Sequence, residues 1–212
     1  MEPLALALAA AGGVLGVAAD RFATRWPEHD EEHPPGRKID WRTVVVAVVS
    51  AVVFGLLPLR FAGTPLALIV FGAWFATLML GLATDLDQRV LPDELTLPVI
   101  PVALVYAISG QNPLVGGAVL PAILAAVLIP AVLYLPSIPF GAGAFGMGDV
   151  KFLVGMGLLL GGERALGGTL VGLLVAGAVL IVLLATRRIG RKSYIPFGPF
   201  LIIGALWAVL IR

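Results

Sequence analysis

Cysteine is absent from this chain of 212 residues, and the only two histidines are His29 and His33. Without cysteine the chain can form no disulfide, no thiolate zinc site and no cysteine nucleophile. Both histidines lie in the acidic stretch 28–33, where we expect a solvated loop instead of a surface metal site. The sequence therefore predicts neither a bound metal nor a cofactor.

Charged residues are also scarce. They make up 13% of the chain, about half of the share that is typical of soluble domains, whereas 59% of the residues are hydrophobic. The mean hydropathy is +1.03. The net charge is only +1, and the 14 Lys and Arg residues do not form the concentrated basic face that a groove for phosphates requires. These values predict an integral membrane protein in a lipid bilayer and exclude nucleic acid as a partner.

Long apolar runs occupy most of the sequence. A helix needs about 20 apolar residues to cross a hydrocarbon core of roughly 30 Å. We predict eight such segments, at residues 3–22, 43–61, 65–84, 95–109, 113–135, 146–161, 165–186 and 195–211. The predicted fold is therefore all-α, a polytopic membrane bundle of about eight transmembrane helices in a single domain, 1–212. The polar, proline-containing stretch 23–42 is predicted to be a mobile cytoplasmic loop.

The distribution of positive charge supports this topology. With eight spans and the N-terminus outside, 11 of the 14 Lys and Arg residues fall in cytoplasmic loops, as the positive-inside rule requires. Only Arg60, Arg164 and Arg212 remain on the other side. If segment 146–161 did not span, the cluster 187–192 would change sides and the bias would vanish. No positive residue precedes the first apolar run, so we predict an uncleaved span there and not a signal peptide.

Two aspartates stand at the ends of predicted spans. Asp85 closes the apolar run 65–84, and Asp149 follows Gly146-Met147-Gly148 at the start of another run. A carboxylate is costly to hold at a membrane boundary and is therefore a functional-site hypothesis. The predicted topology puts both aspartates on the cytoplasmic side, where they can meet.

Two carboxyl groups held close together in a water-poor site cannot both ionise easily, so we expect them to share one proton. One would then activate water as a general base while the other polarises a carbonyl group, which is peptide hydrolysis without serine, cysteine or metal. Gly146 and Gly148 would let an extended peptide approach Asp149. We expect an auxiliary role for Asp87, and we expect Lys151 to reach the membrane interface or to pair with an acid.

Several alternatives are open at this point. Asp149 could simply stabilise a helix N-terminus, as we expect for Asp93 and Glu94. A proton-coupled transporter also places acids in a helix bundle, although usually nearer the middle of the membrane. A non-catalytic scaffold of a secretion assembly would need the acids only as caps. A serine–lysine pair that uses Lys151 or Lys192 is a further alternative.

Three motifs, taken in order, resemble those of the type IV prepilin peptidases, which are membrane aspartyl proteases of the Gly-x-Gly-Asp class. The likeness covers residues 65–211. Asp85 with Leu91, Pro92, Asp93, Leu95, Thr96 and Pro98 is similar to the first catalytic motif of the family. The segment Gly146-Met147-Gly148-Asp149-Val150-Lys151 is similar to the second, and Pro196–Phe200 is similar to a motif of the last helix.

This resemblance implies an aspartic endopeptidase whose catalytic residues are Asp85 and Asp149. It also implies that the enzyme cleaves the leader peptide of prepilin or pseudopilin precursors at the cytoplasmic face of the inner membrane. Many members of the family carry a cytoplasmic insertion with paired cysteines and methylate the new N-terminus. The short loop 23–42 stands in its place and has no cysteine, so we expect a peptidase without N-methyltransferase activity. The particular pilin and the oligomeric state are left open.

Overall fold

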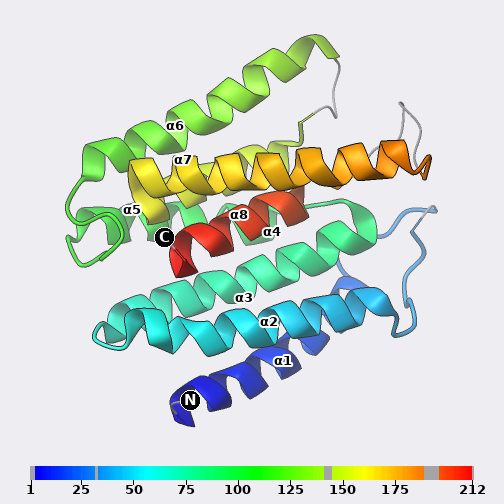
Figure 1. Cartoon of the computed structure of the whole chain (residues 1–212), viewed down its shortest axis with the longest axis horizontal. Helices are drawn as coiled ribbons and strands as arrows, with labels where there is room; N and C mark the ends of the chain where they lie inside the picture. The colour runs from blue at the N-terminus through cyan, green and yellow to red at the C-terminus, as the bar shows by residue number, and fades with distance from the viewer. Residues whose placement is uncertain (1–2, 32, 141–144, 189–195, 212) are drawn as a thin grey trace.

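The computed structural model describes residues 3–31, 33–140, 145–188 and 196–211. Within these ranges the chain forms helices and no β-strand, which confirms the predicted all-α class. The elements are α1 (Pro3–Ala23), α2 (Trp41–Phe61), α3 (Pro65–Gln88), α4 (Asp93–Thr96), α5 (Val99–Ile108), α6 (Val119–Tyr134), a 3-10 turn (Leu135–Phe140), α7 (Met147–Ala185) and α8 (Gly198–Leu210). The long helices lie side by side in one bundle, with α1 and α6 on opposite outer sides (Figure 1).

Five helical segments are long and apolar enough to cross a membrane: α1, α2, α3, α6 together with the turn after it, and α7. The helix α8 is apolar but shorter. Large apolar side chains also face outward, such as Val14 and Leu174, which are both 73% exposed. Outward-facing side chains of this kind suit contact with lipid tails. The chain is a multi-pass membrane protein, while the number of eight crossings stays a prediction.

The longest helix, α7, is interrupted at Gly161. The φ of 76° and ψ of 175° at this residue lie in a region that is essentially restricted to glycine. The two parts fold back on each other, as the closeness of Gly168 to Met156 shows. A methyl group on Gly168 would lie 2.6 Å from Cε of Met156. Residues 147–160 and 162–185 are thus two antiparallel helical halves, which correspond to two separate segments of the sequence prediction.

The predicted segment 113–135 is helical only from Val119, because Asn112 organises the preceding turn. The buried side chain of Asn112 donates to the carbonyl oxygen of Leu159 (2.9 Å) and accepts from the N–H of Leu114 (2.9 Å). Buried polar groups need hydrogen-bond partners, and these two bonds allow the side-chain amide of Asn112 to lie inside an apolar bundle. Apolar patterning alone does not reveal this link between the start of α6 and α7.

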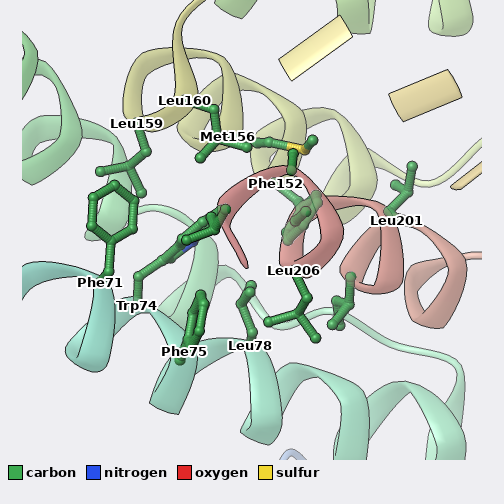
Figure 2. Close-up of a cluster of buried hydrophobic side chains, with 14 of the residues drawn as sticks. Phe71, Trp74, Phe75, Leu78, Phe152, Met156, Leu159, Leu160, Leu201 and Leu206 are labelled. Atoms are coloured by element: carbon green, nitrogen blue, oxygen red, sulfur yellow. The ribbon is translucent and has the colours of Figure 1, made fainter. Parts of the chain in front are cut away.

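The helix α3 occupies the centre of the bundle and packs against α1, α2 and α8. Figure 2 shows Phe71, Trp74 and Phe75 of α3 directed toward side chains of α7 and α8. Phe71 is fully buried and stacks on Phe61 of α2, with ring centroids 4.8 Å apart. Aromatic pairs of this kind contribute about 0.5–1.5 kcal/mol beyond the burial of their area. Because α3 packs against other helices on several sides, a side chain near its end has a defined position.

Facing glycines bring α7 and α8 into close contact. A methyl group on Gly204 of α8 would lie 2.0 Å from the carbonyl oxygen of Gly168 in the second half of α7. Small residues permit this approach between helices in lipid, where dispersion and not the hydrophobic effect drives association. The position of α8 against α7 therefore depends on glycine, which has no side chain, at positions 168 and 204.

We expect Gly204→Ala to lower the thermal stability of the protein, since overpacking a tight contact costs about 1–3 kcal/mol. The matched control is Gly177→Ala in α7, where a methyl group meets nothing within 4 Å. The control should be neutral or slightly stabilising, because alanine favours the helix. Thermal unfolding of both purified variants, followed by tryptophan fluorescence, measures the difference. Equal melting temperatures would contradict the close glycine contact.

Candidate active site

The end of α3 and the beginnings of α7 and α8 lie together at one end of the bundle, on the right in Figure 1. Asp85 is in the last turn of α3 and is 4% exposed, and Asp149 is in the first turn of α7 and is 9% exposed. The two carboxyl groups are close enough for their charges to interact. The acids that the sequence analysis paired thus lie at the same end of the fold.

The first turn of α7 orients Asp149. Gly146 is the N-cap residue, in an extended conformation, and its backbone N–H donates to the carboxylate of Asp149. This is one half of a capping box, so Asp149 does stabilise the helix N-terminus. Gly148 packs on the chain that follows α3, where a methyl group would lie 2.7 Å from the carbonyl oxygen of Leu91. One glycine therefore donates to the acid, and the other lets its helix approach the chain beyond Asp85.

Asp85 is held where α3 ends. The backbone N–H of Arg89 donates to the carbonyl oxygen of Asp85 (2.9 Å), and Arg89 adopts a left-handed φ of 60° that stops the helix. The carboxyl oxygen Oδ2 of Asp85 is buried and has no hydrogen-bond partner among the described residues. A buried carboxyl oxygen without a protein partner does not stabilise the fold, and such groups call for a functional explanation.

The beginning of α8 covers the carboxyl group of Asp85. A methyl group on Gly198 would lie 3.0 Å from Cγ and 3.1 Å from Oδ2 of Asp85. Glycine is therefore the residue that leaves room for the acid at this position. The sequence predicted that Pro196–Pro199 break the start of the last helix near the site and serve in packing, but it did not predict that Gly198 contacts Asp85.

An aromatic pair joins the two glycine-containing segments. Phe145 precedes Gly146, Phe197 precedes Gly198, and the two rings meet edge to face with centroids 5.6 Å apart. The segment beside Asp149 and the segment beside Asp85 are thus connected by a direct contact. This pair was also missed from the sequence, because the spacing of phenylalanines does not show which loops meet.

The two polar residues predicted to support the site both lie at this end of the bundle. The Nζ atom of Lys151 is 2.5 Å from Oδ1 of Asp93, so Lys151 pairs with an acid. Asp93 is 55% exposed, and an exposed pair of this kind contributes at most about 1 kcal/mol. Asp87 is 6% exposed and forms ion pairs with Arg37 and Arg42.

The histidines differ from the prediction in one respect. The side chain of His29 is only 4% exposed, and its Nε2 lies 3.4 Å from Oδ2 of Asp87, so this part of the loop is not fully solvated. His33 lies near Asp30, with Nδ1 and Oδ1 2.9 Å apart. Among the residues that the structure describes, no group of three or more histidines and acids could hold a metal ion.

A serine–lysine site finds little support in the described ranges. The hydroxyl groups of Ser109 and Ser137 each donate to the carbonyl oxygen three residues earlier, and Ser50 is buried inside the bundle. Lys151 is paired with Asp93. The other candidate lysine, Lys192, lies outside the described residues, as do Arg191 and Arg212 of the charge count.

Comparison with known proteins identifies the family. Residues 70–186 match the type IV leader peptidase family, and the chain belongs to it. The chain is 33% identical over 138 residues to a prepilin leader peptidase/N-methyltransferase of Burkholderia pseudomallei (strain 1026b), which covers 65% of this chain and 44% of that protein. It is 30% identical over 175 residues to the enzyme of the same name from Pseudomonas putida, covering 82% of this chain and 60% of the relative.

A third relative is the type 4 prepilin-like proteins leader peptide-processing enzyme of Escherichia coli O78:H11. It is 29% identical over 178 residues, which are 82% of this chain and 63% of the relative. The chain therefore spans between 44% and 63% of the length of these three proteins. No solved structure matches the chain.

We expect Gly148→Ala to destabilise the protein by about 1–3 kcal/mol. The added methyl group would meet the backbone carbonyl group of Leu91, which cannot move aside as a flexible side chain can. The control is Gly63→Ala, beyond the end of α2, where a methyl group meets nothing within 4 Å. Chemical or thermal unfolding of the purified variants in detergent gives the comparison. If both variants unfold alike, the start of α7 does not lie against Leu91 as described.

Proposed function

We propose that this chain is a membrane aspartic endopeptidase that removes the leader peptide from type IV prepilin-like precursors, with Asp85 and Asp149 as its catalytic residues. The observation that carries the proposal is the convergence of these two buried carboxyl groups at one end of the bundle, in a chain of the type IV leader peptidase family. The relatives are named for leader-peptide processing, which supports the substrate class.

In the proposed reaction the two aspartates hold one proton between them. The ionised carboxylate takes a proton from water, and the water oxygen attacks the carbonyl carbon of the scissile peptide. The protonated carboxyl group donates to the carbonyl oxygen and stabilises the developing charge. The carbon–nitrogen bond then breaks as a proton passes to the leaving amine. The low exposure of both side chains supports this scheme, because electrostatic interactions strengthen where water is excluded.

The positions of the arginines support a site on the cytoplasmic side of an eight-span bundle. Arg37 and Arg42, from the predicted cytoplasmic loop, bind Asp87 at the end of α3 that also carries Asp85. Arg60 and Arg164, which the topology assigns to the other side, bind carbonyl oxygens at the C-terminal end of α8. The charge bias follows the positive-inside rule, and we infer that the protein resides in the inner membrane with its aspartates toward the cytoplasm.

The substrate we propose is a helix that stays in lipid while its polar leader reaches the cytoplasm. Its scissile bond would then lie at the interface, beside Asp85 and Asp149. Gly146, beside the carboxylate of Asp149, would leave space for an extended backbone at that point, whereas the open side of Gly148 is filled by Leu91. We propose that the chain has no methyltransferase activity, since the loop 23–42 contains no cysteine.

The central test replaces each acid by its amide. Asp85→Asn and Asp149→Asn should each abolish cleavage of a co-expressed prepilin precursor, because neither variant can hold and transfer the shared proton. Removing one member of a catalytic unit typically costs a factor of about 10³ or more. The measurement is the mobility shift of the precursor on a gel, together with the amount of enzyme in the membrane fraction.

Glu31→Gln is the matched control for this test, since it removes an exposed acid at the same end of the bundle and should process the precursor normally. Substantial cleavage by both aspartate variants would rule out the aspartyl mechanism. An unprocessed precursor with the unmodified enzyme would instead favour a proton-coupled transporter or a non-catalytic scaffold.

A second test concerns Gly198. We expect Gly198→Ala to push the carboxyl group of Asp85 away from its place and to reduce kcat by about 10- to 100-fold, as a displacement of about 1 Å commonly does. KM should change little, because the added methyl group displaces Asp85 and takes no part in binding the leader. Gly177→Ala, which adds the same methyl group where space is open, is the control. Unchanged kcat in Gly198→Ala would show that the contact does not position Asp85 for the reaction.

A further inference from the structure

Arg37 binds carboxylates from three different helices. Its Nε donates to Asp87 (2.6 Å), its Nη1 to Asp40 (2.5 Å) and its Nη2 to Asp20 (2.6 Å). Asp20 lies near the end of α1, Asp40 is the N-cap of α2, and Asp87 is in the last turn of α3. A planar guanidinium has donors in fixed directions and can make all of these bonds at once. One side chain therefore joins the ends of the first three helices.

The surroundings of Arg37 balance its charge. Asp20 is fully buried and also binds Arg21, and Asp87 is nearly buried and also binds Arg42 at 3.1 Å. With Asp40, three carboxylates thus face three guanidinium groups. Buried ions are tolerated when each keeps a well-placed partner, and removal of one partner leaves an uncompensated charge. The cluster is therefore sensitive to the loss of its central member.

A short loop delivers Arg37 to this place. The backbone N–H of Gly36 donates to the carbonyl oxygen of Thr24, at 2.7 Å, which folds the described part of the loop back onto the end of α1. Gly36 has a φ of +82°, which glycine adopts without strain. Arg37 also lines a pocket between the loop and Asp87. The stretch that the sequence predicted as a mobile loop has a defined contact with α3.

Asp87 connects this cluster to the proposed active site, because it lies two residues after Asp85 in the same helical turn. The Oδ2 atom of Asp85 has no hydrogen-bond partner among the described residues, so apart from its packing against Gly198 the position of its carboxyl group depends on the backbone of that turn. We propose that Arg37 is a positioning residue for the peptidase reaction. By tying Asp87 to Asp20 and Asp40, it fixes the turn of α3 from which Asp85 acts. This inference rests on the proposed function.

The first experiment measures kcat and KM of Arg37→Gln and Arg37→Lys with a purified precursor. Arg37→Gln should lower kcat by about 10- to 100-fold with KM nearly unchanged, since the aspartate and not the binding of the leader is displaced. Arg37→Lys should be intermediate, because lysine keeps the charge but not the planar fork. Arg25→Gln removes an exposed arginine of the same loop and should behave as the unmodified enzyme.

A double-variant comparison tests the route through Asp87. If Arg37 acts on Asp85 through Asp87, then Arg37→Gln and Asp87→Asn together should reduce kcat no further than the more damaging single variant. Losses that multiply would show independent roles and would overturn the proposed route. A fall in membrane-inserted protein with unchanged kcat of the purified remainder would also overturn it, because the role of Arg37 would then be structural only.

The third experiment does not depend on activity. Because the chain has no cysteine, Glu31→Cys and Glu94→Cys give a unique pair of sites for spin labels, one in the loop and one on α4. Both positions are exposed. We expect a narrow distance distribution in the labelled parent and a broad one when Arg37→Gln is added. An unchanged distribution would refute the proposal that Arg37 holds the helix ends together. A failure of the parent enzyme to cleave the precursor would refute the proposed function, and the distance measurement would still test the contacts of Arg37.

Discussion

A carboxylate kept away from water needs either a cation beside it or a proton on it, and this requirement shapes one end of the bundle. Asp20 and Asp87 meet it with arginines. Asp85 and Asp149 are almost as buried, yet neither forms an ion pair within the described ranges. The two solutions lie within one turn of α3, so the ion-paired Asp87 lies beside the unpaired Asp85 that we propose as a catalytic residue.

Backbone contacts at glycine bring the unpaired acids together. Gly198 leaves space for the carboxyl group of Asp85, Gly146 donates to Asp149, and Gly148 meets the chain that follows α3. None of these contacts would survive unchanged with a larger residue, because each distance to the missing methyl group is close to or below ordinary van der Waals separation. The end of the bundle is therefore defined by where side chains are absent as much as by where they are present.

Sequence patterns predicted the helical class, the approximate limits of the helices and the shared end of Asp85 and Asp149, because apolar runs and positive-charge bias are strong signals in membrane proteins. They also predicted two spans, 146–161 and 165–186, with a reversal between them, but not that Gly161 makes this reversal within a single residue, since only its backbone angles distinguish the turn. Nor did they reveal the role of Arg37, whose three partners are separated from it by 3 to 50 residues. Contacts across helix ends leave no periodic trace in a sequence.

The reversal at Gly161 also sets the length of the helix that begins at Asp149's turn. At 1.5 Å per residue, the half from 147 to 160 is roughly 21 Å long and α8 is roughly 20 Å long, against roughly 36 Å for α3. If all three helices cross the bilayer, as in the proposed topology, a bilayer that matches α3 on one flank would be thinned beside the shorter helices. Headgroups and their water would then lie closer to the two aspartates, and the hydrolysis that we propose would have its second reactant nearby.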